Sequence, residues 1–189
     1  MPNTYSPSER QILLDIAKQS IQHGLTEGRP LKVALETLPQ ALQQVRASFV
    51  TLELQGRLRG CIGMLAAVKP LAQDVANNAF AAAFNDTRFP QLSKAEFDSG
   101  ALDIHISVLS PMEEVKFSSE EELLSLIRPG VDGLLLADEN HHGTFLPAVW
   151  EDLPDKGQFL QHLKMKAGLP PNYWSNTLEV YRYTAESIP

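Results

Sequence analysis

Strand-like and helix-like segments are interleaved along this 189-residue sequence, without the strand–helix–strand rhythm of a parallel sheet. Apolar residues recur at every second position in residues 49–54, 57–64 and 102–109, which is typical of strands with one buried face. Gln55-Gly56 separates the first two segments, so we expect them to form a hairpin. Residues 71–84 instead show helical spacing and are rich in alanine. This order predicts an α+β fold with mostly antiparallel sheets and flanking helices.

The remaining elements are expected from caps and breakers. Ser6-Pro7-Ser8-Glu9 has the pattern of a capping box, and Gly24 is the expected end of the helix that follows it. The same signals predict short helices after Ser93 and Ser119. A second hairpin is expected over 134–137 and 144–149, a helix over 157–167 and a strand over 177–184. Residues 26–47 mix turn residues with a weak apolar pattern and allow either a short helix or a loop.

Length and composition limit the class of protein. A chain of 189 residues, 43% of them hydrophobic, is long enough for one domain, 1–189, with room for a small sub-lobe. The single cysteine, Cys61, excludes an intramolecular disulfide. No signal peptide or apolar stretch of about 18 residues is evident, so a cytoplasmic protein with no membrane partner is expected. The net charge of −7 argues against a surface built for nucleic acid.

One segment carries distinctive chemistry, residues 58–63 with the sequence Leu-Arg-Gly-Cys-Ile-Gly. Two glycines weaken a strand, so Gly60 and Gly63 indicate close approach by another element or a ligand. On an alternating strand Arg59 and Cys61 share one face, and Leu58, Gly60 and Ile62 share the other. A guanidinium beside a thiol favours the thiolate, which is its reactive form. The alternative is that Cys61 is a small buried apolar residue.

Other motifs indicate no metal or cofactor. His141-His142 lie beside acidic residues, but neighbouring turn residues rarely converge on one ion, so a solvated turn is favoured. His105 alternates outward from its strand and is interpreted as a surface or interface group. The sequence contains no P-loop and no dinucleotide fingerprint. We therefore expect neither a metal nor a cofactor.

The hexapeptide at 58–63 resembles the signature of the AMMECR family. Residues 83–90, Ala-Phe-Asn-Asp-Thr-Arg-Phe-Pro, resemble a second block of that family, and residues 106–110 a third. Three further segments resemble the C-terminal blocks of bacterial members: 133–136, 145–147 and 166–169 followed by Trp174. Ala148 is a departure, because bacterial relatives often carry glutamine there. The resemblance covers the chain from about residue 10 to its end.

The resemblance implies an α+β fold with a larger and a smaller lobe, and the hexapeptide near a cleft between them. It also implies membership of an AmmeMemoRadiSam-type set, together with a Memo-type protein and a radical-SAM protein. The family supplies no established reaction. Partners of these two kinds are therefore an expectation, and the oligomeric state is left open.

Three functions are compatible with these residues. The first is a small enzyme or accessory enzyme subunit with Arg59 and Cys61 as catalytic candidates, and with Gly60, Gly63, Asp86 and Arg88 as ligand-binding candidates. Arginine pairs suit carboxylate or phosphate groups. Asp86 and Arg88 have a structural alternative, which is to pin their own loop. A base near Cys61 is missing from the local sequence, and His105 or His162 are the candidates.

The second function is a non-catalytic binding or scaffold protein for the partner set. Exposed apolar patches would favour it. The third, a nucleic-acid regulator, is disfavoured by the net charge, although a basic stripe formed by Arg57, Arg59 and Arg88 would favour it.

Overall fold

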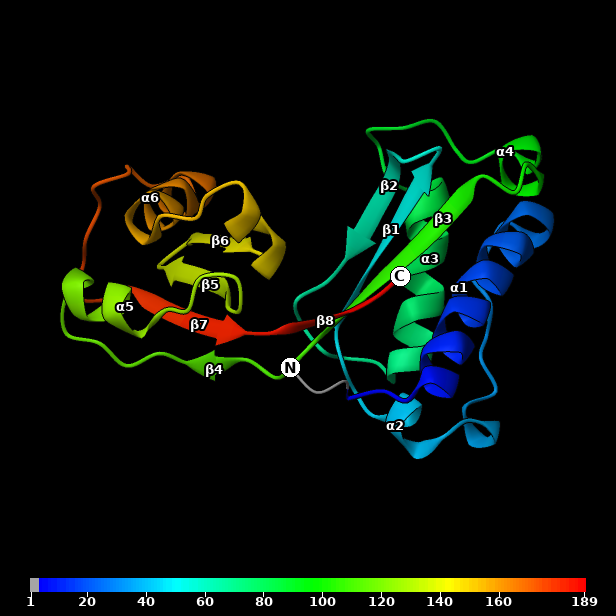
Figure 1. Ribbon diagram of the computed structural model, residues 1–189, viewed down its shortest axis with the longest axis horizontal. Helices are drawn as coiled ribbons and strands as arrows, with labels where there is room; N and C mark the ends of the chain where they lie inside the picture. Colours follow the sequence, from blue (N-terminus) through cyan, green and yellow to red (C-terminus); the bar gives the residue numbers. More distant parts are fainter. Residues whose placement is uncertain (1–3) are drawn as a thin grey trace. The chain divides into compact units, whose positions relative to one another are not determined.

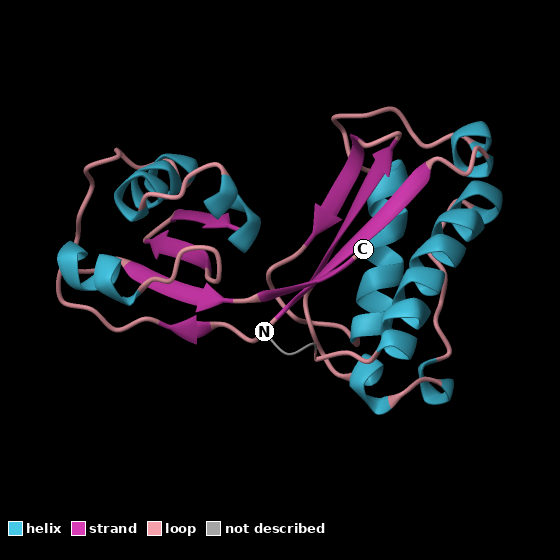
Figure 2. Ribbon diagram, viewed as in Figure 1, coloured by secondary structure: helices cyan, strands magenta, loops and turns pink. Residues whose placement is uncertain are grey.

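The computed structural model describes residues 4–189. The chain divides into two compact units, each with its own sheet and hydrophobic core. The first unit comprises residues 4–109 and Glu186–Pro189, and the second comprises Ser110–Ala185. Both sheets are antiparallel and are accompanied by helices (Figures 1 and 2), so the predicted α+β fold is confirmed.

The first unit contains a four-stranded sheet with the order β2-β1-β3-β8. Its strands are β1 (Ser48–Leu54), β2 (Arg57–Gly63), β3 (Leu102–Leu109) and β8 (Ala185–Ile188). Its helices are α1 (Pro7–Glu27), α2 (Gln40–Gln43), α3 (Leu71–Phe84) and α4 (Lys94–Asp98), with a short 3₁₀ helix at Leu35–Thr37. Helices α1 and α3 lie side by side on one face of the sheet (Figure 1).

The core of the first unit lies between these helices and the sheet. Val50 and Leu52 of β1 and Ile106 of β3 are fully buried against the apolar stripes of α1 and α3. The small residues of α3 allow the helix to approach the sheet closely. The hairpin between β1 and β2 turns at Gln55 and Gly56, whose φ angles of 54° and 73° fit a tight turn of the expected kind.

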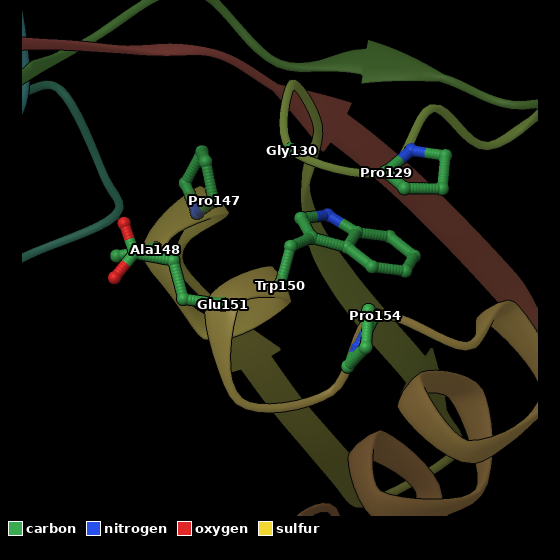
Figure 3. A pocket seen from close by; sticks show the side chains of 7 residues that line it. All are labelled: Pro129, Gly130, Pro147, Ala148, Trp150, Glu151 and Pro154. Atoms are coloured by element: carbon green, nitrogen blue, oxygen red, sulfur yellow. The ribbon is translucent and has the colours of Figure 1, made fainter.

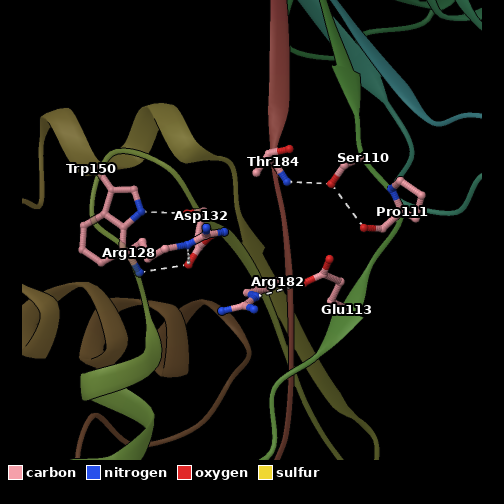
Figure 4. Close-up of polar contacts among 8 residues, drawn as sticks. All are labelled: Ser110, Pro111, Glu113, Arg128, Asp132, Trp150, Arg182 and Thr184. Carbon is pink, nitrogen blue, oxygen red and sulfur yellow. Dashed lines mark hydrogen bonds and ion pairs between the residues drawn. The ribbon is translucent and has the colours of Figure 1, made fainter. Parts of the chain in front are cut away.

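The second unit contains a sheet with the order β4-β7-β5-β6. Its strands are β4 (Glu113–Glu114), β5 (Gly133–Asp138), β6 (His141–Phe145) and β7 (Glu179–Tyr183), and its helices are α5 (Glu120–Leu126), α6 (Lys156–Lys166) and a 3₁₀ turn at Pro147–Glu151. Figure 4 shows polar contacts that join its segments. The amide of Thr184 donates to the hydroxyl of Ser110 at 2.9 Å, and Arg182 pairs with Glu113 at 3.2 Å.

Several expected boundaries were wrong. Helix α1 continues through Gly24 and ends at Glu27, because the left-handed cap is Gly28 with a φ of 68°. The strand expected to reach Val149 stops at Phe145, since Pro147 lacks the amide hydrogen that a strand ladder needs. His141 and His142 lie in β6 instead of a turn. Among residues 4–189, no helix combines the length and apolarity that a bilayer crossing requires.

Candidate functional site

The hexapeptide forms most of β2, which is an edge strand with a bulge. Leu52 pairs with Gly60 and Glu53 pairs with Leu58, so Arg59 is the extra residue between them. The expectation that Leu58 and Gly60 share one face was therefore wrong, because these two residues pair with neighbouring residues of β1. The same bulge separates Leu58, which is exposed, from the buried Gly60. A single inserted residue shifts every side chain beyond it to the other face.

The two glycines of the segment are required by backbone packing. A Cβ atom on Gly60 would lie 2.0 Å from the carbonyl oxygen of Ala82 in α3. A Cβ atom on Gly63 would lie 2.3 Å from the ring of Phe49. Close approach by another element, one of the two explanations that the sequence offered, therefore accounts for both glycines. Their contact with a ligand stays a prediction.

The loop after α3 holds the free edge of β2 at Cys61. The Cys61 amide donates to the Asp86 carboxylate at 2.9 Å, and the Arg88 guanidinium lies 3.4 Å from the Cys61 carbonyl oxygen. Arg88 also donates from Nε and Nη2 to Asp86, at 3.0 and 2.7 Å. These contacts bring residues 85–90 alongside the hexapeptide. They also give Asp86 and Arg88 the loop-pinning role that was the structural alternative.

The Asp86 carboxylate is buried but strongly stabilised as an anion. Its side chain is 4% exposed, whereas that of Arg88 is 56% exposed. The hydrogen bond from Arg88, assisted by that from the Cys61 amide, holds the pKa of Asp86 far below its ordinary value. The same hydrogen bond raises the pKa of Arg88. The loop is thus tied to β2 by a permanent charge pair at neutral pH.

Arg59 is held by a second carboxylate that the sequence analysis did not connect with it. Its Nε and Nη2 atoms donate to Glu96 of α4 at 2.8 and 3.2 Å. Hydrogen bonds from Arg59, and then from Ser93, lower the pKa of Glu96 to about 2. Glu96 also completes the capping box of Ser93 at the start of α4. Nη1 of Arg59 is buried and lacks a hydrogen-bond partner within residues 4–189.

The two arginines meet at one aromatic ring. The guanidinium carbons of Arg59 and Arg88 lie 6.0 and 5.5 Å from the ring centroid of Phe89. Such distances allow cation–π attraction to both side chains. Phe89 was part of the quoted sequence block but had no predicted role. Each guanidinium uses its Nε and Nη2 edge for a carboxylate, which leaves its Nη1 edge for another acceptor.

Cys61 lies in a polar row across the sheet. Thr51 is the Cα partner of Cys61 on one side and of His105 on the other. The Thr51 hydroxyl is 3.1 Å from the Cys61 sulfur. His105 lies 3.7 Å from Glu53 and is 39% exposed. His105, one of the two bases that the sequence suggested, therefore lies two strands from the thiol, about 10 Å away at ordinary strand spacing. His162 belongs to the second unit.

The second unit has a cavity of about 490 Å³ that no sequence motif predicted (Figure 3). Three prolines, at positions 129, 147 and 154, surround it together with Trp150 and Glu151. Trp150 is fixed there, since its ring stacks on Phe159 at 3.7 Å and its Nε1 donates to the Asp132 carbonyl oxygen at 2.7 Å (Figure 4). Across residues 4–189, no group of three or more His, Cys, Asp or Glu is placed to hold a metal ion.

Comparisons with known proteins agree along almost the whole chain. A protein of Methanothermobacter thermautotrophicus is 39% identical over 183 residues, covering 96% of this chain and 94% of its own. Protein MJ0810 of Methanocaldococcus jannaschii is 35% identical and covers 82% of this chain and 78% of its own. The crystal structure of the uncharacterized protein PH0010 from Pyrococcus horikoshii superposes with a TM-score of 0.81 at 34% identity, over 93% of this chain and 88% of its own. The AMMECR1 family model matches residues 14–188, and the chain therefore belongs to the AMMECR1 family.

Proposed function

We propose that this protein is a small enzyme, or an accessory subunit of one, that binds an anionic group of its substrate beside Cys61. The observation that carries the proposal is the pair of arginines on Phe89. Arg59 and Arg88 are each fixed by a carboxylate, and each keeps its Nη1 edge free of protein partners among the described residues. Fixed guanidinium donors of this kind suit a carboxylate or a phosphate.

Each side chain has a stated role in this proposal. The exposed Arg88 makes the first contact with the anion, and Arg59 orients it. Asp86 and Glu96 are positioning residues, because they fix the two guanidinium groups. Cys61 supplies the thiol, and the row through Thr51 to His105 supplies a candidate base. The distance across that row requires a hydroxyl or water bridge between sulfur and imidazole.

The same proposal includes two partners, a Memo-type protein and a radical-SAM protein, in the cytoplasm. Its support is the resemblance of the hexapeptide and the later sequence blocks to proteins of that set. Co-expression of the three chains tests it. We expect a complex that survives size-exclusion chromatography, or an activity that needs all three proteins. If both the complex and the activity persist when this chain is omitted, the proposal is contradicted.

The anion site is tested by NMR titration with inorganic phosphate and with acetate. We expect saturable shifts of the Cys61 and Arg88 amide signals, and an Arg88→Gln variant that binds at least about tenfold more weakly. Arg128→Gln is the matched control. Arg128 is 52% exposed and pairs with the fully buried Asp132, so this variant also leaves a buried aspartate unpaired, but far along the chain from Cys61 (Figure 4). Equal loss of binding in both variants would contradict a site at Arg88.

One observation favours the scaffold alternative. Val45, Leu58, Met64 and Val68 are large apolar residues that are 44–62% exposed. The segments that carry Val45 and Val68 lie next to each other, since Val45 forms a bridge with Pro70 and the Arg46 amide donates to the Lys69 carbonyl oxygen. An apolar patch around residues 45 and 64–68 suits a protein partner. Substitution of Met64 and Val68 by serine discriminates the scaffold from the anion-binding enzyme. If the protein is a scaffold, the substitution should weaken partner binding, and it should leave phosphate binding intact.

A further inference from the structure

Five consecutive apolar residues follow β2 directly, at positions 64–68 with the sequence Met-Leu-Ala-Ala-Val. Met64 and Val68 are 50% and 62% exposed, both alanines are exposed, and Leu65 is half-buried. Across residues 4–189, the hydrophobic core of the first unit includes none of the five. Because an exposed apolar run of this length does not stabilise the fold, it indicates a surface that binds a partner. We call these five residues the apolar loop.

The apolar loop bulges outward because the chain on either side of it is fixed to a shorter segment. The Met64 amide donates to the Ser48 carbonyl oxygen at 3.4 Å, and Pro70 forms a bridge with Val45. Between these two contacts, four residues of one segment face seven of the other. The surplus residues must bulge away from their neighbour, and Val45 at the base of the bulge is itself 47% exposed. The apolar loop and Val45 therefore form one exposed patch.

Positive charge flanks this patch, although the chain as a whole has a net charge of −7. Arg46 and Lys69 lie at its base, where the Arg46 amide donates to the Lys69 carbonyl oxygen at 3.3 Å. Neither side chain forms an ion pair within residues 4–189. The sequence has no Asp or Glu over residues 37–52 or 54–73. The patch therefore complements a partner surface that is both apolar and acidic.

The backbone of the apolar loop favours a protein partner over an anionic lipid surface. Residues 65–68 make no backbone hydrogen bond to any of residues 4–189, so water solvates their amide and carbonyl groups. Hydrocarbon cannot replace that water, and burying these groups in lipid would be costly. An extended polypeptide segment can replace it with its own amides and carbonyls. The apolar loop continues β2, which is an edge strand, so such a segment can add alongside it.

We propose that the apolar loop binds an extended segment of a partner protein that combines apolar residues with at least one Asp or Glu. The apolar side chains of the partner cover Met64, Val68 and Val45, and its carboxylates pair with Arg46 and Lys69. The inference names the chemistry of the partner for the scaffold alternative and rests on that alternative. It does not depend on the anion site at Arg88.

A display library of random peptides, selected on the whole protein, tests the proposal. We expect the enriched peptides to combine Asp or Glu with large apolar residues. The net charge of −7 favours basic peptides in general, so an acidic preference has to come from a local patch. An enriched peptide, titrated by NMR, should shift the amide signals of residues 64–69 in a saturable manner.

Three outcomes would overturn the proposal, and they differ in what they leave standing. Peptides that bind at residues 64–69 but lack acidic residues would refute the chemistry of the partner and leave the scaffold alternative intact. Peptides that bind only elsewhere, or no enriched peptides at all, would refute both. Binding to vesicles of anionic phospholipid in place of any peptide would identify a lipid surface.

Variants locate the surface. Met64→Ser should weaken binding of the enriched peptide at least about fivefold, and Lys69→Gln at least about threefold, with the second effect shrinking as salt screens the charge. Met165→Ser and Lys166→Gln are the matched controls, because both residues are exposed in the second unit and Met165 is 46% exposed. The thermal midpoint verifies that each variant is folded. Peptide binding that survives Met64→Ser and Lys69→Gln, or that the control variants weaken equally, would contradict the proposal.

Discussion

At the scale of single residues, the site depends on two carboxylates that hold two arginines. Asp86 connects the Cys61 amide with the Arg88 guanidinium, and Glu96 connects Arg59 with the cap of α4. Both carboxylates have lowered pKa values because the arginines hydrogen bond to their charged forms. Ionised Asp86 and Glu96 therefore stabilise the folded state, and this stabilisation is lost only when acid protonates the two carboxylates.

Asp86→Asn tests this contribution. We expect the variant to lower the free energy of unfolding at pH 7 by roughly 2 kcal/mol, because it weakens hydrogen bonds to a charged group. The folded pKa of Asp86 lies below its unfolded value of 3.8. The stabilisation by the carboxylate is therefore complete above about pH 4 and declines as the pH falls further, so the difference between wild type and variant should narrow there.

Urea unfolding followed by circular dichroism from pH 7 to pH 2.5 measures this difference. Tryptophan fluorescence would not report on it, because Trp150 and Trp174 both lie in the second unit. Parallel stability curves for the two proteins across this range would show that Asp86 is not held as an anion by the fold.

The sequence singled out some of the residues that meet here, but it did not give their geometry, and it gave no such role to Glu96 or Phe89. The ordered sequence blocks identified Arg59, Cys61, Asp86 and Arg88, and hydrogen bonds join the last three. The bulge at Arg59 is a feature of the pairing of β2 with β1, which alternation in one strand does not reveal. The ion pair of Arg59 with Glu96 joins residues that are 37 positions apart in the sequence, so no local pattern indicates it. Whether these residues bind a ligand stays a prediction.

At the scale of elements, the close contact between β2 and α3 positions the hexapeptide. The Gly60 backbone lies directly against the Ala82 carbonyl group, and the loop after α3 then continues to Cys61. The bounds of α3 and β3 agree with the expected ranges 71–84 and 102–109, because both elements have long, regular patterns. Strands β4 and β8 were not expected, since two and four residues are too few to show alternation.

Gly60→Val tests this packing. A valine would place its Cβ atom 2.0 Å from the Ala82 carbonyl oxygen, so α3 must shift away from the sheet. We expect the free energy of unfolding to fall by more than about 1 kcal/mol. Gly157→Ala is the matched control at the start of α6, where a Cβ atom would meet only the end of the Asp155 side chain at 3.2 Å. It should change stability by less than about 0.5 kcal/mol. An unchanged urea midpoint for Gly60→Val would exclude close backbone approach.

At the scale of the whole molecule, the second unit is inserted between two neighbouring strands of the first. The chain leaves the first unit after β3 and returns in β8, and these two strands are neighbours in one sheet. The amide of Thr184 donates to the hydroxyl of Ser110 at 2.9 Å (Figure 4), and the amide of Ser110 donates to the carbonyl of Thr184, also at 2.9 Å. The two connecting segments thus run together where they leave and re-enter the first unit.

This connection predicts that the first unit folds alone. Replacing residues 111–183 by Asn-Gly joins Ser110 to Thr184 through a two-residue hairpin turn. We expect the shortened protein to unfold cooperatively in urea and to retain the dispersed amide spectrum of the Cys61 region. A chain that remains unfolded in the absence of urea would show that the two units depend on each other for folding.

We propose that Cys61 is an accessible thiol beside an anion-binding arginine. The most direct measurement compares the rates at which the single cysteine reacts with iodoacetate and with neutral iodoacetamide. The ratio of the two rates is measured in the folded protein and, as the reference, in the same chain unfolded in urea at equal ionic strength. Because the net charge of −7 opposes iodoacetate, a general electrostatic effect would lower the ratio on folding. We expect both reagents to label the folded protein, and we expect folding to raise the ratio of the iodoacetate rate to the iodoacetamide rate. Labelling only after unfolding, or a ratio that folding leaves unchanged or lowers, would contradict it.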